Sequence, residues 1–263
     1  MDLTDKMDHL RQIIKMLPSS AVAFSGGVDS ALLASVLLEV QGDQALALTV
    51  DSIFASREEM EDAINFATEI GIEHQMIALD EMDDSVMANP VDRCYHCKKK
   101  VFSTLLETAQ ALGRNILLDG SNLDDLDDYR PGMKAIKELG VKSPFLEAQL
   151  TKAEIRKFSK ARGLSIWNKP SMACLASRIP YDDPITSESL RMVETAEKYL
   201  ITRGLIRFRV RKHGNLARIE VSPEERPLFF DLTLMEEVSS ELKKIGFRFV
   251  ALDLQGYRTG SLN

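Results

Sequence analysis

Short apolar runs alternate with longer amphipathic segments along the first half of the chain, and this alternation strongly limits the folds that it can adopt. The apolar runs are typical of buried strands, and the segments between them carry apolar residues at helical spacing. Strands that alternate with helices form βαβ crossovers, which place a parallel sheet between two layers of helices. We therefore predict an α/β fold with a doubly wound parallel sheet. The expected strands are 21–24, 45–50, 75–79 and 115–118, and the expected helices are 30–40, 57–69, 98–112 and 151–162.

The last third of the chain follows a different pattern. A helix, two strands, a second helix and a last strand succeed one another, which predicts a smaller C-terminal α+β domain. Pro180 and Pro184 bracket a short polar stretch, and we place the domain boundary there. We expect a first domain at 1–180 and a second at 185–263. The expected elements of the second are helices 187–202 and 236–245 and strands 206–212, 217–222 and 247–254.

Composition excludes several classes of protein. Hydrophobic residues make up 44% and charged residues 28% of the 263 residues, as in a soluble globular protein. The longest nearly uncharged apolar stretch, 31–40, is well short of the ~20 residues that cross a bilayer, so we expect no membrane span. The first residues form neither a basic nor an apolar leader, which predicts a cytoplasmic protein. The formal net charge of −7 argues against nucleic acid as a partner.

A glycine-rich turn directly follows the first expected strand. Residues 25–30 read Ser-Gly-Gly-Val-Asp-Ser and lead into the next expected helix. Adjacent glycines let the backbone approach a ligand closely and turn successive N–H groups inward. The helix N-terminus adds unpaired donors and the positive end of its dipole. The arrangement predicts a phosphate-binding loop, with an ordinary tight turn capped by serine as the alternative.

Polar residues also close two other expected strands. Asp51 and Ser52 follow the second strand, and the string 119–122, Asp-Gly-Ser-Asn, follows the fourth. The carboxyl ends of parallel strands share one edge of a sheet, where ligands bind. Five aspartates lie between Asp119 and Asp128. Beside a phosphate site such a loop could hold Mg²⁺, and a merely solvated loop is the alternative.

The string at residues 25–30 resembles the SGGxDS signature of the PP-loop pyrophosphatases. These enzymes bind ATP, transfer AMP to a carboxyl or carbonyl oxygen and release pyrophosphate. The resemblance implies an adenine nucleotide alpha hydrolase-like fold for residues 1–180, with ATP and Mg²⁺ as ligands. It also implies that the turn binds the pyrophosphate and that Asp51 helps to hold the adenosine. The turn residues given this role are Ser25, Gly26, Gly27, Asp29 and Ser30.

Three cysteines are too few, and odd in number, for a disulfide framework. Cys94 and Cys97 stand just before a basic run and an expected helix, and both features favour thiolate over thiol. Cys174 lies in a loop-like stretch further on. Three thiolates fit a 4Fe–4S cluster that leaves one iron open. A redox or persulfide-carrying thiol set, a zinc site and inert thiols are the alternatives, and His96 is not expected to be a ligand.

A basic stretch marks the first two strands of the second domain. Seven basic residues and no acidic one lie between Lys198 and Arg218. Arg207, Arg209 and Arg211 alternate along an expected strand, so they share one face of it. Guanidinium groups on one face suit a phosphate monoester, and a solvated strand face is the alternative.

Further strings point to one family within the PP-loop superfamily. With the glycine turn they are similar, over nearly the whole chain, to the LarE-type ATP-dependent sulfur transferases. Those enzymes adenylate a carboxylate of a pyridinium dicarboxylate mononucleotide and convert it to a thiocarboxylate in nickel-pincer nucleotide cofactor biosynthesis. The strings are 128–132, 167–169, 171–174, 177–181, 209–211, 217–220 and 253–258.

This resemblance assigns a role to the cysteines. Cys174 matches the cysteine that one branch of the family gives up as sulfur donor, leaving dehydroalanine. That branch carries Trp and Ala where this chain has Cys94 and Cys97. The sequence therefore resembles the three-cysteine branch, in which the thiolates hold a 4Fe–4S cluster through which sulfur is delivered. It predicts repeated turnover without loss of the cysteine.

The resemblance also gives the second domain a role in binding substrate and in oligomerisation. Arg209 and Arg211 match positions linked to the phosphate of the nucleotide substrate. Glu197 and Glu220 match acidic positions near a divalent metal, although by residue type alone they are charge partners. Because the family forms homo-oligomers and sheet edges need cover, we expect a homo-oligomer.

Two other functions remain open at this point. A PP-loop tRNA thiolase can also pair this loop with three cysteines and an iron–sulfur cluster, but it needs a broad positive surface. A non-catalytic ATP- or iron-sensing protein would bind the same ligands without releasing pyrophosphate.

Overall fold

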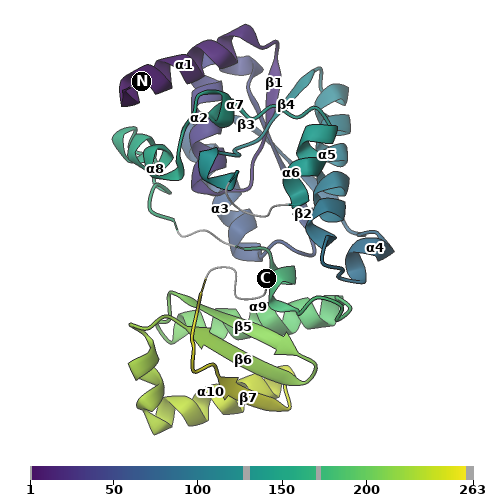
Figure 1. The fold of residues 1–263 in the computed structure, drawn as a ribbon, viewed down its shortest axis with the longest axis vertical. Coiled ribbons are helices and arrows are strands. Elements are labelled where there is room, and N and C mark those ends of the chain that lie inside the picture. The colour runs from purple at the N-terminus through teal and green to yellow at the C-terminus, as the bar shows by residue number, and fades with distance from the viewer. Residues whose placement is uncertain (1, 127–130, 170–172, 259–263) are drawn as a thin grey trace. The chain divides into compact units, whose positions relative to one another are not determined.

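The structure, a computed structural model, describes residues 2–126, 131–169 and 173–258. The chain forms two compact units (Figure 1). By contacts, residues 83–91 and 173–180 belong with the C-terminal unit, and the domain boundary expected between residues 180 and 185 stays a prediction. The first unit holds Met1–Met82 and Asp92–Met172, and the second holds Asp83–Val91 and Ala173–Asn263.

The first unit is built on a parallel sheet, as predicted. Its strands pair in the order β3-β2-β1-β4, and every pairing is parallel. In the register, Ala21 of β1 stands opposite Leu46 of β2 and Leu117 of β4. Lys142 continues the sheet beyond Leu118 through an isolated parallel bridge. The strands are β1 (Ser20–Ala23), β2 (Leu46–Ser52), β3 (Glu73–Leu79) and β4 (Ile116–Leu118).

Helices cover both faces of this sheet, which confirms the doubly wound α/β architecture (Figure 1). Successive strand residues enter different cores because side chains alternate along a strand. Val22 and Leu118 pack in a core with α1, α2, α3 and α8, whereas Ala21 and Leu117 pack in a core with α5 and α6. The helices are α1 (Leu3–Met16), α2 (Val28–Gln41), α3 (Arg57–Ile70), α5 (Arg93–Ala111), α6 (Pro131–Glu138), α7 (Pro144–Glu147) and α8 (Lys152–Ala161), with short 3-10 turns η1 (Gly42–Gln44) and η2 (Leu123–Asp125).

Capping residues set where the helices begin. The Thr151 hydroxyl accepts from the Glu154 N–H, and the Glu154 carboxylate accepts from the Thr151 N–H, as the sequence predicted for α8. Asp2 and Asp5 form the same reciprocal cap on α1, a helix that the sequence analysis missed.

The second unit carries a mixed three-stranded sheet in the order β5-β6-β7. β5 and β6 are antiparallel, and β6 and β7 are parallel. Val210 and Ile219 face a core shared with α9 and α10, in line with the predicted α+β unit. Its elements are α4 (Asp84–Met87), η3 (Leu175–Arg178), α9 (Ser187–Thr202), β5 (Phe208–His213), β6 (Leu216–Val221), η4 (Arg226–Phe230), α10 (Leu232–Ile245) and β7 (Phe249–Leu252).

Asn89 ties the short segment around α4 to the second unit. It is fully buried, and its Nδ2 donates to the carbonyl oxygens of Pro180 at 2.6 Å and Asp183 at 2.9 Å. In the same region the Ile185 N–H donates to the Met87 carbonyl at 2.8 Å. These bonds explain why residues 83–91 leave the unit that precedes them in the chain.

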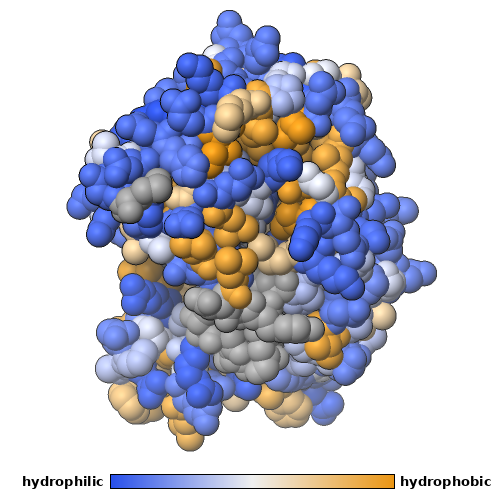
Figure 2. Space-filling model, turned by 45° about the horizontal axis from the view of Figure 1, so that its top comes forward, coloured by the Kyte–Doolittle hydropathy of each residue, from blue (hydrophilic) through white to orange (hydrophobic). Residues whose placement is uncertain are grey.

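Polar and charged residues cover much of the face shown in Figure 2, and hydrophobic residues gather in separate areas between them. Among the described helices, none is both long and apolar enough to cross a membrane.

Candidate functional site

The strand order places the glycine turn where a doubly wound sheet binds ligands. From β1 the chain steps to β2 and β3 on one side, and it then returns to β4 on the other side of β1. The carboxyl ends of β1 and β4 therefore flank the topological switch point, which is the usual ligand crevice of such sheets. Residues 25–30 follow β1, and residues 119–122 follow β4.

The two glycines are required by the backbone path. Gly26 has φ of +67°, and a Cβ added there would lie 3.2 Å from the Ala63 Cβ and from the Glu59 carbonyl oxygen of α3. Gly27 is the N-cap of α2 and offers no side-chain cap to its first amides. An uncapped helix N-terminus beside a left-handed glycine leaves N–H donors for an anion.

Serine hydroxyls line the same turn. The Ser25 and Ser30 Oγ atoms are 3.2 Å apart, and the Ser30 hydroxyl donates to the Gly27 carbonyl at 3.1 Å. The chain directly after β1 is held against β2, because the Thr49 hydroxyl donates to the Phe24 carbonyl at 2.6 Å. Since that hydroxyl has one hydrogen, the His74 Nε2 at 2.8 Å must be the donor to Thr49.

A lysine that sequence reasoning did not assign to the site contacts the turn. Lys169 Nζ donates to the Gly26 carbonyl at 3.0 Å and pairs with the Asp62 carboxylate at 2.7 Å. The Arg156 guanidinium holds the segment in place through the carbonyls of Trp167, at 3.0 Å, and Lys169, at 2.8 Å. Residues 143 positions apart make this contact, so no local pattern could reveal it.

The aspartates at the strand ends differ in their surroundings. Asp51 pairs with the exposed Arg57 at 2.8 Å. Surface ion pairs of this kind are weak, so a ligand can replace the arginine. Asp119 accepts hydrogen bonds from the hydroxyls of Ser121 and Ser143 and is buried. Asp119 thus stabilises the loop itself, and because it is buried it does not fit the solvated loop that was the alternative to a Mg²⁺ site. Asp127 and Asp128 lie outside the described residues.

Asp29 is the acidic residue that lies in the turn. It is in the first turn of α2, and its Oδ2 accepts from the Asn122 Nδ2 at 3.4 Å. Gly120 lets the β4 loop approach, since a Cβ there would lie 3.1 Å from the Ser30 nitrogen. A carboxylate at this turn supplies the oxygen ligands that Mg²⁺ prefers.

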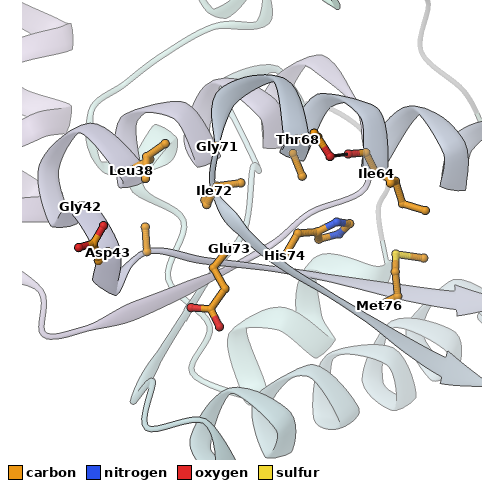
Figure 3. Close-up of a pocket in the computed structure, with 12 residues that line it drawn as sticks. Leu38, Gly42, Asp43, Ile64, Thr68, Gly71, Ile72, Glu73, His74 and Met76 are labelled. Atoms are coloured by element: carbon orange, nitrogen blue, oxygen red, sulfur yellow. Dashed lines mark hydrogen bonds between the residues drawn. The ribbon is translucent and has the colours of Figure 1, made fainter.

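A hollow of about 840 Å³ lies at the opposite end of the strands, between α3 and the start of β3 (Figure 3). Leu38, Ile64 and Ile72 line it together with His74. It is therefore not the crevice at the glycine turn, and the switch point is the better guide to the nucleotide site.

The cysteines are divided between the two units. The predicted start of the helix at residue 98 is wrong, because α5 begins at Arg93 and Cys94 and Cys97 lie in its first turns. At a spacing of three residues they share one face of the helix, and both are half-buried. Arg93, itself buried, places Nη2 4.0 Å from the Cys94 sulfur. The tertiary contact from the Tyr95 hydroxyl to Glu138 of α6, at 2.7 Å, holds this early start.

Cys174 is exposed in the second unit, directly before η3. Residues 170–172, which precede it, lie outside the described part of the chain. Within that described part, no three His, Cys, Asp or Glu side chains gather as a metal site. The three-thiolate cluster therefore stays a prediction.

The two arginines of β5 have different environments. Arg211 is buried and donates to the Ser177 carbonyl at 2.5 Å and to Glu220 at 3.0 Å. Arg209 donates to the Phe208 carbonyl at 2.6 Å and stacks 5.0 Å from the Tyr257 ring. Among the described residues, no carboxylate forms an ion pair with Arg209. Burial and the charges of Arg178 and Arg211 lower the pKa of Arg209, and together they outweigh the opposing effect of the Glu197 charge.

The two candidate metal-binding glutamates are engaged by arginines. Glu197 forms a bidentate pair with Arg178, with both N–O distances 2.9 Å. Glu220, which is 1% exposed, accepts from Arg211 at 3.0 Å and from Arg218 at 2.8 Å. Either carboxylate would have to release an arginine to bind a metal, so these contacts favour the charge-partner alternative. Arg207 precedes β5 and is exposed, so it does not share the strand face.

A strand, a left-handed glycine and an uncapped helix N-terminus, at the switch point of a parallel sheet, are the arrangement of a nucleotide-binding α/β domain, here of the PP-loop class. The NAD synthase family matches residues 3–118, which hold this turn.

Similarity to curated proteins extends over the whole chain. Pyridinium-3,5-bisthiocarboxylic acid mononucleotide synthase of Lactiplantibacillus plantarum is 38% identical over 99% of this chain and 95% of its own length. An uncharacterized protein of Synechocystis sp. is 45% identical over 99% of this chain and 98% of its own length. A tRNA-specific 2-thiouridylase of Rickettsia bellii is 29% identical, over 57% of this chain and 51% of its own length. The chain belongs to the LarE family of PP-loop ATP-dependent sulfur transferases, the family of the first of these proteins.

Proposed function

We propose that this enzyme inserts sulfur into a carboxylate of a pyridinium dicarboxylate mononucleotide, in the biosynthesis of the nickel-pincer nucleotide cofactor. The observation that carries this proposal is the 38% identity to the L. plantarum synthase, because it spans both units and not the PP-loop alone. The thiouridylase similarity covers little more than half of the chain and supports the shared ATP chemistry only.

The reaction needs ATP because a carboxylate is a poor electrophile. A carboxylate oxygen of the substrate attacks the α-phosphorus of ATP, and pyrophosphate leaves with the electron pair of the broken P–O bond. The acyl-adenylate then has AMP as a good leaving group. A sulfur nucleophile adds to the acyl carbon, and AMP departs to leave a thiocarboxylate.

The residues of the glycine turn would stabilise the first step. The N–H groups at Gly26 and Gly27 and the hydroxyls of Ser25 and Ser30 would bind the pyrophosphate as its charge develops. Asp29 would hold Mg²⁺, which neutralises charge on the phosphates when bound. Asp51, released from Arg57, would contact the adenosine.

Arg209 would bind the phosphate monoester of the mononucleotide. It is a half-buried cation that forms no carboxylate ion pair within the described part of the chain, and it lies on a polar strand face. Such a cation gains most from an anionic ligand. Arg211 would act beside it, although its contacts with Glu220 and Ser177 also give it a structural role.

The thiols of Cys94, Cys97 and Cys174 would hold a 4Fe–4S cluster. Thiolates are the ligands that such clusters require, and the first two share one helix face beside the Arg93 guanidinium. Three protein ligands would leave one iron of such a cluster open for an exchangeable sulfur. A persulfide carried by the same thiols is the remaining alternative for the sulfur source.

Two assays test this proposal. Anaerobically purified enzyme, given ATP and the pyridinium dicarboxylate mononucleotide, should release pyrophosphate only with that substrate and yield a product in which one oxygen is replaced by sulfur. Pyrophosphate release that depends on tRNA, with salt-sensitive binding, would instead support the thiolase alternative. ATP binding without pyrophosphate release on any carboxylate would support a sensor.

The cluster has its own test. Iron and acid-labile sulfide are measured in the wild-type protein and in Cys94→Ala, both purified without oxygen. We expect the variant to lose most of its iron, whereas Ser103→Ala, further along α5, keeps it. Full iron retention in Cys94→Ala would remove this cysteine from the cluster.

A further inference from the structure

Arg178, in η3, contacts both the backbone at Cys174 and the carboxylate of Glu197. The Arg178 side chain is 1% exposed, and its Nη1 donates to the carbonyls of Ala173 at 2.6 Å and Cys174 at 3.2 Å. The other edge of its guanidinium grips Glu197 with two bonds of 2.9 Å. One planar group thus joins the cysteine loop to α9.

Glu197 lies directly against the strand that carries Arg209. Its Oε1 also accepts from the Val210 N–H at 2.9 Å, next to Arg209 in β5. The carboxylate is near enough to act on Arg209 electrostatically and to favour its charged form. Glu197 nevertheless forms its ion pair with Arg178, which donates to both carboxylate oxygens, and not with Arg209.

We propose that Arg178 is a positioning residue that occupies Glu197, so that Arg209 stays available for the substrate phosphate, and that holds the backbone of Cys174. The proposal rests on the proposed function, since it takes a phosphate monoester as the ligand of Arg209. The charge of Arg178 would then affect the affinity for the substrate phosphate. Its hydrogen bonds to the loop of Cys174 would affect the rate of sulfur insertion.

Loss of the Arg178 charge has a defined consequence. Glu197 is largely buried, and an unpaired buried carboxylate attracts the nearest cation strongly. In Arg178→Gln the nearby Arg209 takes the place of the lost partner and is withdrawn from the ligand. Removing the carboxylate as well, in Arg178→Gln/Glu197→Gln, takes away this competitor and frees Arg209 again.

The experiment compares these variants in the full chain with nicotinic acid mononucleotide as the probe, a pyridine carboxylate with a phosphate monoester. Calorimetry should show ~10- to 100-fold weaker binding in Arg178→Gln and recovery toward wild type in the double variant. Arg203→Gln, which breaks the exposed pair with Glu237, should bind like wild type. Sulfur insertion by the double variant should show a recovered KM and a low kcat, because the Ala173 and Cys174 carbonyls still lack their donor.

Three outcomes show which part of the proposal is wrong: the partner exchange, the role at the cysteine loop or the substrate itself. A double variant that folds and binds as weakly as Arg178→Gln overturns the partner exchange, since a purely structural arginine gives no rescue. A double variant with wild-type kcat overturns the role in holding the cysteine loop. Wild-type protein that does not bind the probe contradicts the proposed substrate, and the inference falls with it. If Arg178→Gln does not fold, Arg178→Lys, which keeps the charge and loses the bidentate grip, should keep the affinity and lower kcat.

Discussion

Lys169 and Gly26 are joined by a hydrogen bond from the lysine ammonium to the glycine carbonyl, 3.0 Å long. The same ammonium is held by Asp62 at 2.7 Å, so its position is set before any ligand arrives. Fixing the Gly26 carbonyl on the side of Lys169 orients the peptide units of the turn, and with them the amides that we propose as ligands of the pyrophosphate.

Replacing Lys169 should therefore weaken ATP binding. In Lys169→Gln we expect the KM for ATP to rise about tenfold, because a charge-assisted hydrogen bond is lost. Steady-state pyrophosphate release measures this, and Lys157→Gln, on the exposed side of α8, serves as the control. An unchanged KM in Lys169→Gln would show that the turn keeps its shape without the lysine.

Gly26 should tolerate no side chain. Alanine at φ of +67° is strained by ~1–2 kcal/mol, and its Cβ would also press on Ala63 and Glu59 at 3.2 Å. Gly140 has nearly the same φ, +70°, with no atom within 4 Å of an added Cβ. We expect Gly26→Ala to lose ATP binding in calorimetry, and Gly140→Ala to keep it at the cost of the backbone strain alone. Equal ATP affinity in both variants would contradict the role of the close approach.

Replacing Arg209 should weaken binding of the mononucleotide and leave ATP binding unchanged. Arg209→Gln is expected to raise the KM for the mononucleotide by ~10- to 100-fold and to leave the KM for ATP unchanged. Arg207→Gln, exposed and outside β5, is the matched control and should alter neither value. A loss of ATP affinity in Arg209→Gln would argue against a separate phosphate site on β5.

The titration of His74 should account for part of the pH dependence of stability. Burial lowers the pKa of His74 below its ordinary value of 6.5, so the unfolded chain binds this proton more readily than the folded one. The free energy of unfolding should therefore decrease as the pH falls from 6.5 toward the lower folded pKa. His74→Gln keeps a donor for Thr49 and removes the titration.

Urea unfolding at several pH values between about 7.5 and 5 checks this expectation. The variant should lose less stability than wild type across this range. The pKa of His213 is lowered in the same direction by burial, but His213 is present in both proteins and cancels in the comparison. An identical decline in both proteins would contradict the assignment to His74.

The sequence predicted the sheet well because local patterns encode it. Four apolar runs, a glycine turn and the Thr151–Glu154 cap are all visible within a few residues, and the structure has them where expected. The burial predicted for the run at 75–79 is wrong, because β3 stands at the end of the strand order and none of its residues is buried. The cap of α1 at Asp2 and Asp5 was equally local, so that helix could have been found from the same signal.

The rest depends on contacts between distant residues. The start of α5 at Arg93 is held by Tyr95 against Glu138, on a short helix that the sequence did not predict. Lys169 reaches Gly26 across 143 positions. The pairing of Arg178 with Glu197, which gives that glutamate a partner, required the folded second unit.

Turnover with an external sulfur source tests the central claim most directly. The enzyme is supplied without oxygen with ATP, the mononucleotide, inorganic sulfide and a reductant, and thiocarboxylate is counted per chain while the intact mass of the protein is recorded. We predict several products per chain with residue 174 still cysteine. Product that stops at one per chain, with dehydroalanine at position 174, would contradict sulfur delivery through the three thiolates.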